Sequence, residues 1–137
     1  MQNNFSILAI DPGSSKWGWA VVNHQSVVIA HGINRFEELN IRVTQLHEEY
    51  AFKSIILGDL TGSQEYYRSL ITNCPHLTID FIDESNSTLE ARTVYFELNP
   101  PKGLWKLVPL SFQSPPEDYD NYTAIVLARR YLGANNE

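Results

Sequence analysis

The sequence predicts an α/β fold in which a five-stranded mixed sheet carries helices on both faces. Up to residue 31, three strand-like segments are separated by short turns, which is typical of an antiparallel meander. From residue 36 onward, helical and strand-like segments alternate, as in crossover units that add parallel strands to a sheet. The 137 residues contain no repeat and no linker-like segment, so a single domain over 1–137 is expected.

The predicted strands are apolar runs that end at glycine, asparagine or aspartate. They cover residues 5–10, 17–22, 27–31, 54–58 and 77–83. The run 54–58 is continuously apolar, which is typical of a strand covered on both faces, and Gly32 is expected to close the third strand. The first strand is expected to lie centrally, antiparallel to the second strand and parallel to the fourth.

The predicted helices have apolar residues at helical spacing on one face. They cover residues 36–50, 61–72, 87–98 and 120–132. Ser87-Thr-Leu-Glu90 has the form of a capping box, which favours a helix that begins there. Gly133 is expected to end the last helix. Residues 99–118 are rich in proline and predict a long irregular loop.

Three acidic residues follow predicted strands. Asp11 ends the first strand in phase with Ile7 and Ala9, so its side chain is expected on the same buried face. Asp59 follows the fourth strand and Glu84 follows the fifth. The carboxyl ends of parallel strands meet at one edge of a sheet, where ligands of open α/β sheets usually bind. These acidic groups are therefore expected to lie close together.

Composition excludes several classes of protein. The 43% of hydrophobic residues is typical of a folded globule. The N-terminus lacks the build of a signal peptide and no apolar run is long enough for a membrane span, so a soluble cytoplasmic protein is expected. The single cysteine, Cys74, permits no internal disulfide and suits a reducing compartment. The net charge of −6 argues against tight binding of a polyphosphate.

Three motifs then occur in a characteristic order. Ile-Asp-Pro-Gly at residues 10–13 is followed by Gly18, then by Asp83-Glu84-Ser-Asn-Ser-Thr88, and then by Asp120-x-x-Thr123-Ala124. Over residues 7–132 the chain resembles the YqgF/RuvX-type Holliday junction resolvases of the ribonuclease H-like superfamily, whose relatives include the RuvC resolvases and pre-16S ribosomal RNA nucleases. The resemblance implies a ribonuclease H-like fold and metal-dependent hydrolysis of phosphodiester bonds.

By this match, Asp11, Glu84 and Asp120 correspond to the catalytic carboxylates and metal ligands of that family. Asp59 or Asp118 could be a fourth ligand. Phosphodiester hydrolysis needs an activated water and a stabilised leaving oxygen, and two Mg²⁺ ions about 3.5 to 4 Å apart can provide both. Mg²⁺, or Mn²⁺ in its place, takes oxygen ligands. Carboxylates therefore suit it better than the four histidines, which are scattered along the chain.

Each carboxylate also has an ordinary structural interpretation. Asp11 lies in Asp-Pro-Gly, a good turn sequence, and Asp120 is a common type of helix N-cap. Glu84 could be a solvated residue after a strand, and Asp59 is better explained by a structural or supporting role. The convergence of the acidic groups favours a metal site, because clustered like charges repel and such a cluster is usually retained with a cation.

Nucleic-acid contacts are predicted at basic and aromatic residues near these motifs. The candidates are Lys16 in the first motif, Lys102, Trp105 and Lys106 in the long loop, and Arg129, with Arg130, on the last helix. Trp105 could stack on an unpaired base, whereas Trp17 and Phe112 are expected in the core.

The predicted function is that of a Mg²⁺-dependent nuclease acting on branched DNA or on precursor ribosomal RNA. A resolvase that nicks two symmetric strands would act as a homodimer. One alternative is a binding module of the same fold with weak or no catalysis. Another is a one-lobed nucleotide binder, because Asp-x-Gly-x-x-x-x-Gly also opens the domains of sugar kinases and actin-like ATPases. Such enzymes need two lobes, and 137 residues supply one.

Overall fold

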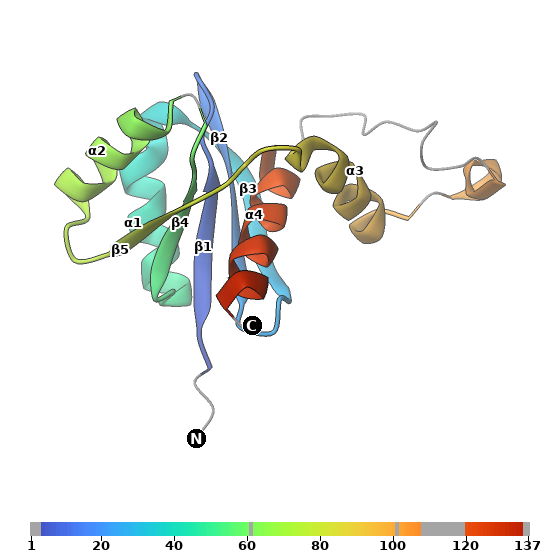
Figure 1. The fold of residues 1–137 in the computed structure, drawn as a ribbon, viewed down its shortest axis with the longest axis horizontal. Coiled ribbons are helices and arrows are strands. Elements are labelled where there is room, and N and C mark those ends of the chain that lie inside the picture. Colours follow the sequence, from blue (N-terminus) through green and yellow to red (C-terminus); the bar gives the residue numbers. More distant parts are fainter. Residues whose placement is uncertain (1–3, 61, 101, 108–119, 136–137) are drawn as a thin grey trace.

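The computed structural model describes residues 4–60, 62–100, 102–107 and 120–135 (Figure 1). The elements occur in the order β1 (Ser6–Asp11), β2 (Lys16–Asn23), β3 (Val28–Arg35), η1 (Phe36–Glu38), α1 (Leu39–Tyr50), β4 (Ser54–Gly58), α2 (Ser63–Asn73), β5 (Thr78–Ile82), α3 (Ser87–Leu98), η2 (Gly103–Leu107) and α4 (Asp120–Asn135). In this part of the chain, no helix is long and apolar enough to cross a membrane.

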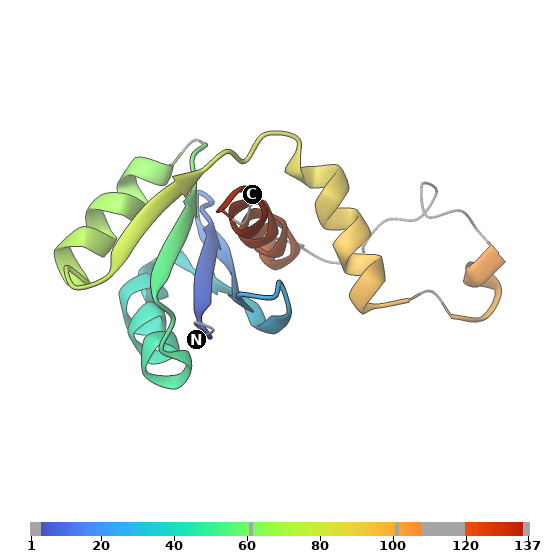
Figure 2. The same cartoon turned by 60° about the horizontal axis from the view of Figure 1, so that its bottom comes forward.

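The five strands form one mixed sheet in the order β3-β2-β1-β4-β5. β1 is antiparallel to β2 and parallel to β4, β2 is antiparallel to β3, and β4 is parallel to β5. The predicted sheet with a central first strand is confirmed. Helices α1 and α2 cover one face, whereas α4 covers the other and α3 lies beside α4 (Figures 1 and 2).

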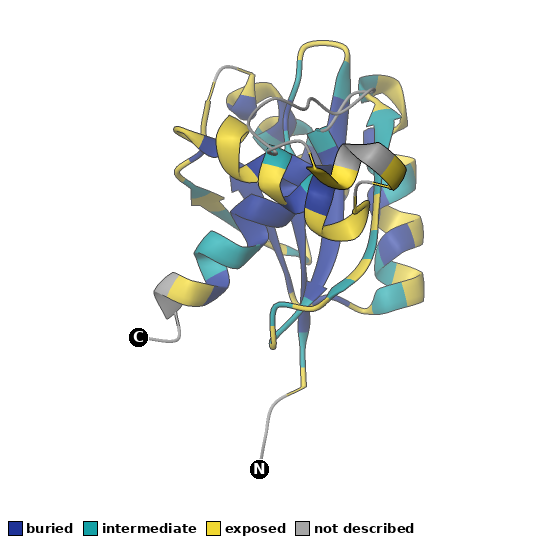
Figure 3. Cartoon of the chain, turned by 90° about the vertical axis from the view of Figure 1, so that its right-hand side faces the viewer, coloured by how far each residue is buried: buried dark blue, intermediate teal, exposed yellow. Residues whose placement is uncertain are grey.

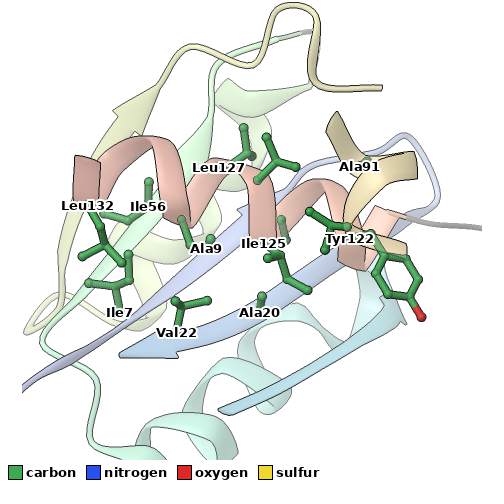
Figure 4. Packing of buried hydrophobic residues seen from close by; sticks show 14 residues of the cluster. Ile7, Ala9, Ala20, Val22, Ile56, Ala91, Tyr122, Ile125, Leu127 and Leu132 are labelled. Carbon is green, nitrogen blue, oxygen red and sulfur yellow. The ribbon is translucent and has the colours of Figure 1, made fainter. Parts of the chain in front are cut away.

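The face under α4 is closed by small and branched side chains. Ala9 and Ala20 leave room for the helix, and Ile125 and Leu127 of α4 pack over them (Figure 4). Because α4 is covered by the sheet on one side and by α3 on another, residues 121–128 are all buried. Figure 3 shows the buried residues concentrated in the sheet and in this helix. The helix is thus fixed against the strands that carry the predicted acidic residues.

The opposite face holds the second part of the core. Leu8 and Ile10 of β1 pack against α1, whose Val43 and Leu46 are fully buried. Trp17 is fully buried there, as expected, and its indole Nε1 donates to the carbonyl of Arg35 at 2.9 Å. The prediction for Phe112 lies outside the described residues.

The predicted third helix, 87–98, is confirmed, whereas two other predicted boundaries and the predicted cap of this helix are wrong for local physical reasons. Gly32 lies inside β3 opposite Trp19 rather than ending the strand, and it is a glycine at a position where a Cβ would meet the indole ring. Ser87 is the first helical residue of α3 rather than its cap; the N-cap is Asn86, which has a left-handed conformation (φ 59°) and no capping side-chain bond. Helix α4 continues through Gly133 to Asn135, since an exposed glycine weakens a helix without necessarily ending it.

The packing under α1 yields a stability prediction. Leu46→Ala removes a fully buried side chain and leaves a cavity, so the free energy of unfolding should fall by about 2 to 5 kcal/mol in urea denaturation. Leu89→Ala is the matched control, because Leu89 is also a helical leucine but is 72% exposed. Its effect should stay within about 0.5 kcal/mol. Equal losses in the two variants would contradict the described core.

Candidate active site

The candidate site lies where β1, β4 and β5 end at one edge of the sheet. Ile10 is opposite Leu57, and Gly58 is opposite Ile82, so the ends of these three strands are in line. Asp11 is the last residue of β1 and Glu84 follows β5 by two residues. Parallel strands thus bring together acidic residues that are 73 positions apart in the sequence.

A close backbone contact brings the third acidic residue to this edge. Gly18 of β2 is the register partner of Asp11. A Cβ on Gly18 would collide with the carbonyl group of Asp120 and with the backbone nitrogen of Asn121. Glycine therefore lets the first turn of α4 rest on β2, and Asp120 comes to lie beside the end of β1.

Glu84 is buried, with 7% of its surface exposed, and is held by hydrogen bonds from the end of β4. Its backbone N–H donates to Asp59 Oδ1 at 3.2 Å, and its Oε2 accepts from the N–H of Leu60 at 3.4 Å. A Cβ on Gly58 would collide with the Glu84 carboxylate. The absence of a side chain at Gly58 therefore gives Glu84 its place over the strand end.

Asp11 and Glu84 share a side-chain hydrogen bond, which requires a proton between the two carboxyl groups. The pKa of Asp11 is raised from 3.8 to about 9, first by burial, then by the hydrogen bond and the charge of Glu84, and least by the charge of Asp120. Without a cation, the pair thus retains a proton at neutral pH, because two adjacent and poorly solvated carboxylates repel each other.

Asp120 belongs to the same electrostatic environment. Burial raises its pKa, the nearby Lys16 ammonium opposes this rise, and the charge of Glu84 adds to it. The structure therefore places Lys16, a predicted phosphate contact, near the acidic residues. Its positive charge compensates part of the negative charge that the three carboxyl groups concentrate here.

The acidic residues at this edge provide a limited set of donors for a divalent cation. Among the residues that the structure describes, no group of three or more His, Cys, Asp or Glu side chains is placed to hold a metal ion. Asp11 and Glu84 nevertheless form an adjacent pair, and Mg²⁺ commonly uses one or two carboxylates and keeps several waters. The pair therefore fits a hard cation in place of the shared proton, with Asp120 as a charged neighbour.

The other predicted site residues are distributed as follows. Asp59 bonds the backbone of Glu84, and Lys102 and Lys106 are exposed. Arg129 forms a two-point ion pair with Glu97 of α3, with nitrogen–oxygen distances of 3.0 and 3.3 Å. Asp118 and the side chain of Trp105 lie outside what the structure describes.

The sequence did not indicate the supporting roles of two residues. The Tyr66 hydroxyl of α2 donates to the carbonyl of Gly13 at 2.6 Å and holds the turn that follows Asp11. Arg130 of α4 donates to the carbonyls of Asp83 and Ser85, on either side of Glu84. Neither has a local signal, because tyrosine and arginine at helical spacing are equally typical of an ordinary helix surface.

Comparison with known proteins supports the fold. No family model and no curated protein matches the chain by sequence. Among solved structures, RuvC of Thermus thermophilus superposes with a TM-score of 0.55 at 7% sequence identity, over 96% of each chain. The chain has a ribonuclease H-like fold.

Two further structures match only in part. A protein named as a sugar kinase, from Cytophaga hutchinsonii, gives a TM-score of 0.46 at 10% identity, over 64% of this chain and 38% of its own. A Ppx/GppA family protein of Aquifex aeolicus gives 0.41 at 11% identity, over 72% and 42%. The chain thus spans less than half of either protein.

The raised pKa of Asp11 predicts how stability depends on pH without metal. The unfolded chain loses this proton near pH 3.8, whereas the folded protein keeps it to about pH 9, so the free energy of unfolding should fall as the pH rises between these values. Asp11→Asn removes this contribution. The variant should be more stable than the parent at pH 8 in chelator, and its stability should fall less steeply with pH. A slope as steep as that of the parent would contradict the buried, protonated pair.

The space at Gly58 yields a second prediction. In Gly58→Ala the new methyl group displaces the Glu84 carboxylate, and the free energy of unfolding should fall by about 1 to 3 kcal/mol. Gly133→Ala is the control, because a Cβ there meets nothing within 4 Å and alanine favours a helix by about 0.5 to 1 kcal/mol. Urea denaturation measures both. Equal stability of the two variants would show that Glu84 does not lie over Gly58.

Proposed function

We propose that this chain is a divalent-metal-dependent nuclease that hydrolyses phosphodiester bonds in structured nucleic acid, as the resemblance to the YqgF/RuvX-type resolvases implies. The observation that carries the proposal is the contact of the half-buried Asp11 with the buried Glu84 at the carboxyl edge of the sheet, with Asp120 beside it. The end-to-end match to RuvC supports it at the level of the fold. Clustered buried carboxylates destabilise a metal-free protein, which favours a role that uses a cation.

Each residue has a defined task in this proposal. Asp11 and Glu84 bind the cation, Mg²⁺ or Mn²⁺, and Asp120 holds the hydration shell or a further ion at the same edge. Once bound, such a cation lowers the pKa of coordinated water and stabilises charge on the phosphoryl group. Asp59 and the Leu60 N–H keep Glu84 oriented, and Lys16 offers a positive charge to a phosphate near Asp120.

The nucleic acid is proposed to contact Lys16 and the exposed Lys102 and Lys106, with Trp105 as a stacking residue. Arg129 is left out of this surface because it is paired with Glu97. With a net charge of −6, the chain should bind weakly and lose affinity steeply with added salt. Branched DNA requires paired cuts and a homodimer, whereas precursor ribosomal RNA requires neither.

A second candidate is a binding module that kept the fold without catalysis. The acidic net charge favours it, as does the lack, among the described residues, of three side chains placed together as metal ligands. The two functions differ in one measurable property. A module binds nucleic acid or metal without cleaving a phosphodiester bond.

Cleavage assays test the proposal. A four-way DNA junction and a structured precursor ribosomal RNA are incubated with the chain in Mg²⁺, Mn²⁺ or EDTA. We expect metal-dependent cleavage of one substrate, lowered at least about a hundredfold in Asp11→Asn and in Glu84→Gln, because each removes a cation ligand. Glu49→Gln is the control, since this exposed residue is near the end of α1 and the opposite edge of the sheet. It should cleave like the parent.

The remaining outcomes separate the candidates. Mn²⁺ binding without cleavage of either substrate favours the module. Cleavage that persists in EDTA, or in Asp11→Asn, contradicts the proposed site and points to a contaminating nuclease or to a different set of residues.

A further inference from the structure

Arg130 makes an unusual set of contacts for a surface arginine. Its Nη1 donates to the backbone carbonyls of Asp83 and Ser85 at 2.9 and 2.8 Å. Its Nε and Nη2 contact Glu90 Oε2 of α3 at 3.2 and 3.1 Å. One guanidinium group therefore joins α4, the loop before α3 and α3 itself, and only 23% of its side chain is exposed.

The two carbonyls flank Glu84, so the contacts fix the peptide groups on both sides of this residue. From the opposite direction, Asp59 accepts the Glu84 N–H. The loop adds its own restraint, because the Asp83 carboxylate accepts from the N–H and hydroxyl of Ser85, both at 3.0 Å. Glu84 is thus placed by hydrogen bonds to its backbone neighbours as well as to its carboxylate.

Such restraint is needed because Glu84 lies in a loop rather than in a strand. Asp11 is fixed by pairing with β2. Glu84 instead lies in the loop between β5 and α3, two residues before Asn86, which has a left-handed backbone. A carboxylate in a loop can keep a side-chain hydrogen bond to a partner on a strand only if the loop backbone holds its position. The planar guanidinium suits this task, because its donors are fixed relative to one another.

We propose that Arg130 is a positioning residue that clamps the Glu84 loop and thereby sets the geometry of the Asp11–Glu84 pair. The inference rests on the proposed function for the role of that pair, whereas the clamp itself rests on the hydrogen bonds from Arg130 to the Asp83 and Ser85 carbonyls and on its ion pair with Glu90. Arg130 is accordingly assigned to the support of the site and not to contact with nucleic acid.

The neighbouring residue supplies a matched control. Arg129 is on the same helix and forms a comparable ion pair with Glu97 of the same helix α3, at 3.0 Å. Its hydrogen bonds run to the Glu97 carboxylate, whereas those of Arg130 also reach the Glu84 loop. An effect that comes from weaker packing of α3 on α4 should therefore appear in variants of either arginine. An effect that comes from a released Glu84 loop should appear only in the Arg130 variant.

The experiment compares the parent, Arg130→Gln and Arg129→Gln by two measurements. Hydrogen exchange of the Glu84 and Ser85 amides is followed without metal, and the dissociation constant for Mn²⁺ is measured by calorimetry. Arg130→Gln should raise the exchange rates about tenfold and weaken Mn²⁺ binding about tenfold, since residues that support metal ligands typically affect affinity on this scale. Arg129→Gln should stay within about twofold of the parent in both.

If Arg130→Gln does not fold, Glu90→Gln replaces it with Glu97→Gln as its control. Glu90 anchors the guanidinium without touching the loop, so its loss should speed exchange at Glu84 more than the loss of Glu97 does. Unchanged exchange in Arg130→Gln, or equal changes in both members of a pair, overturns the clamp. If the parent does not bind Mn²⁺, the proposed function is contradicted. The exchange rates of the Glu84 and Ser85 amides then still test whether Arg130 clamps the loop.

Discussion

The candidate site is built around the contact between the Asp11 and Glu84 carboxyl groups. Asp11 ends β1 and Glu84 follows β5, and these two strands are not adjacent in the sheet. Bringing two such groups together inside a protein is unfavourable unless a proton or a cation lies between them. Without a cation, the pair retains a proton. The raised pKa of Asp11 reflects the free energy that would be needed to ionise both carboxyl groups. The fold tolerates this cost because the rest of the core, on both faces of the sheet, is apolar and closely packed.

The surrounding residues serve to hold this contact. Gly18 and Gly58 lack the side chains that would separate α4 and Glu84 from the strand ends. Tyr66 fastens the turn after Asp11, and Arg130 fastens the loop around Glu84. These interactions come from helices on both faces of the sheet. The ribonuclease H-like architecture thus holds the segments that follow β1 and β5 together at one edge of the sheet.

Much of this arrangement follows from local sequence patterns. The continuous apolar run at Ser54–Gly58 gives a strand covered on both faces, and the meander followed by crossovers determines that β1 is central, so Asp11 and Glu84 could be placed at one edge. Features that depend on distant partners could not be derived. Gly32 lies inside a strand and faces the Trp19 ring, which leaves no room for a side chain there. The hydrogen bonds from Arg130 to the Glu84 loop join residues that are 45 or more positions apart in the sequence.

Acidic charge and nucleic-acid chemistry are compatible only if a cation occupies the carboxylate pair, because phosphates would otherwise be repelled from this edge. The most direct test is a crystal structure of the chain soaked in Mn²⁺, with anomalous scattering used to locate the ion. The account predicts a peak bonded to oxygens of both Asp11 and Glu84. A structure without such a peak at saturating Mn²⁺, or with Asp11 and Glu84 hydrogen-bonded as in the metal-free protein and the ion bound elsewhere, would contradict it.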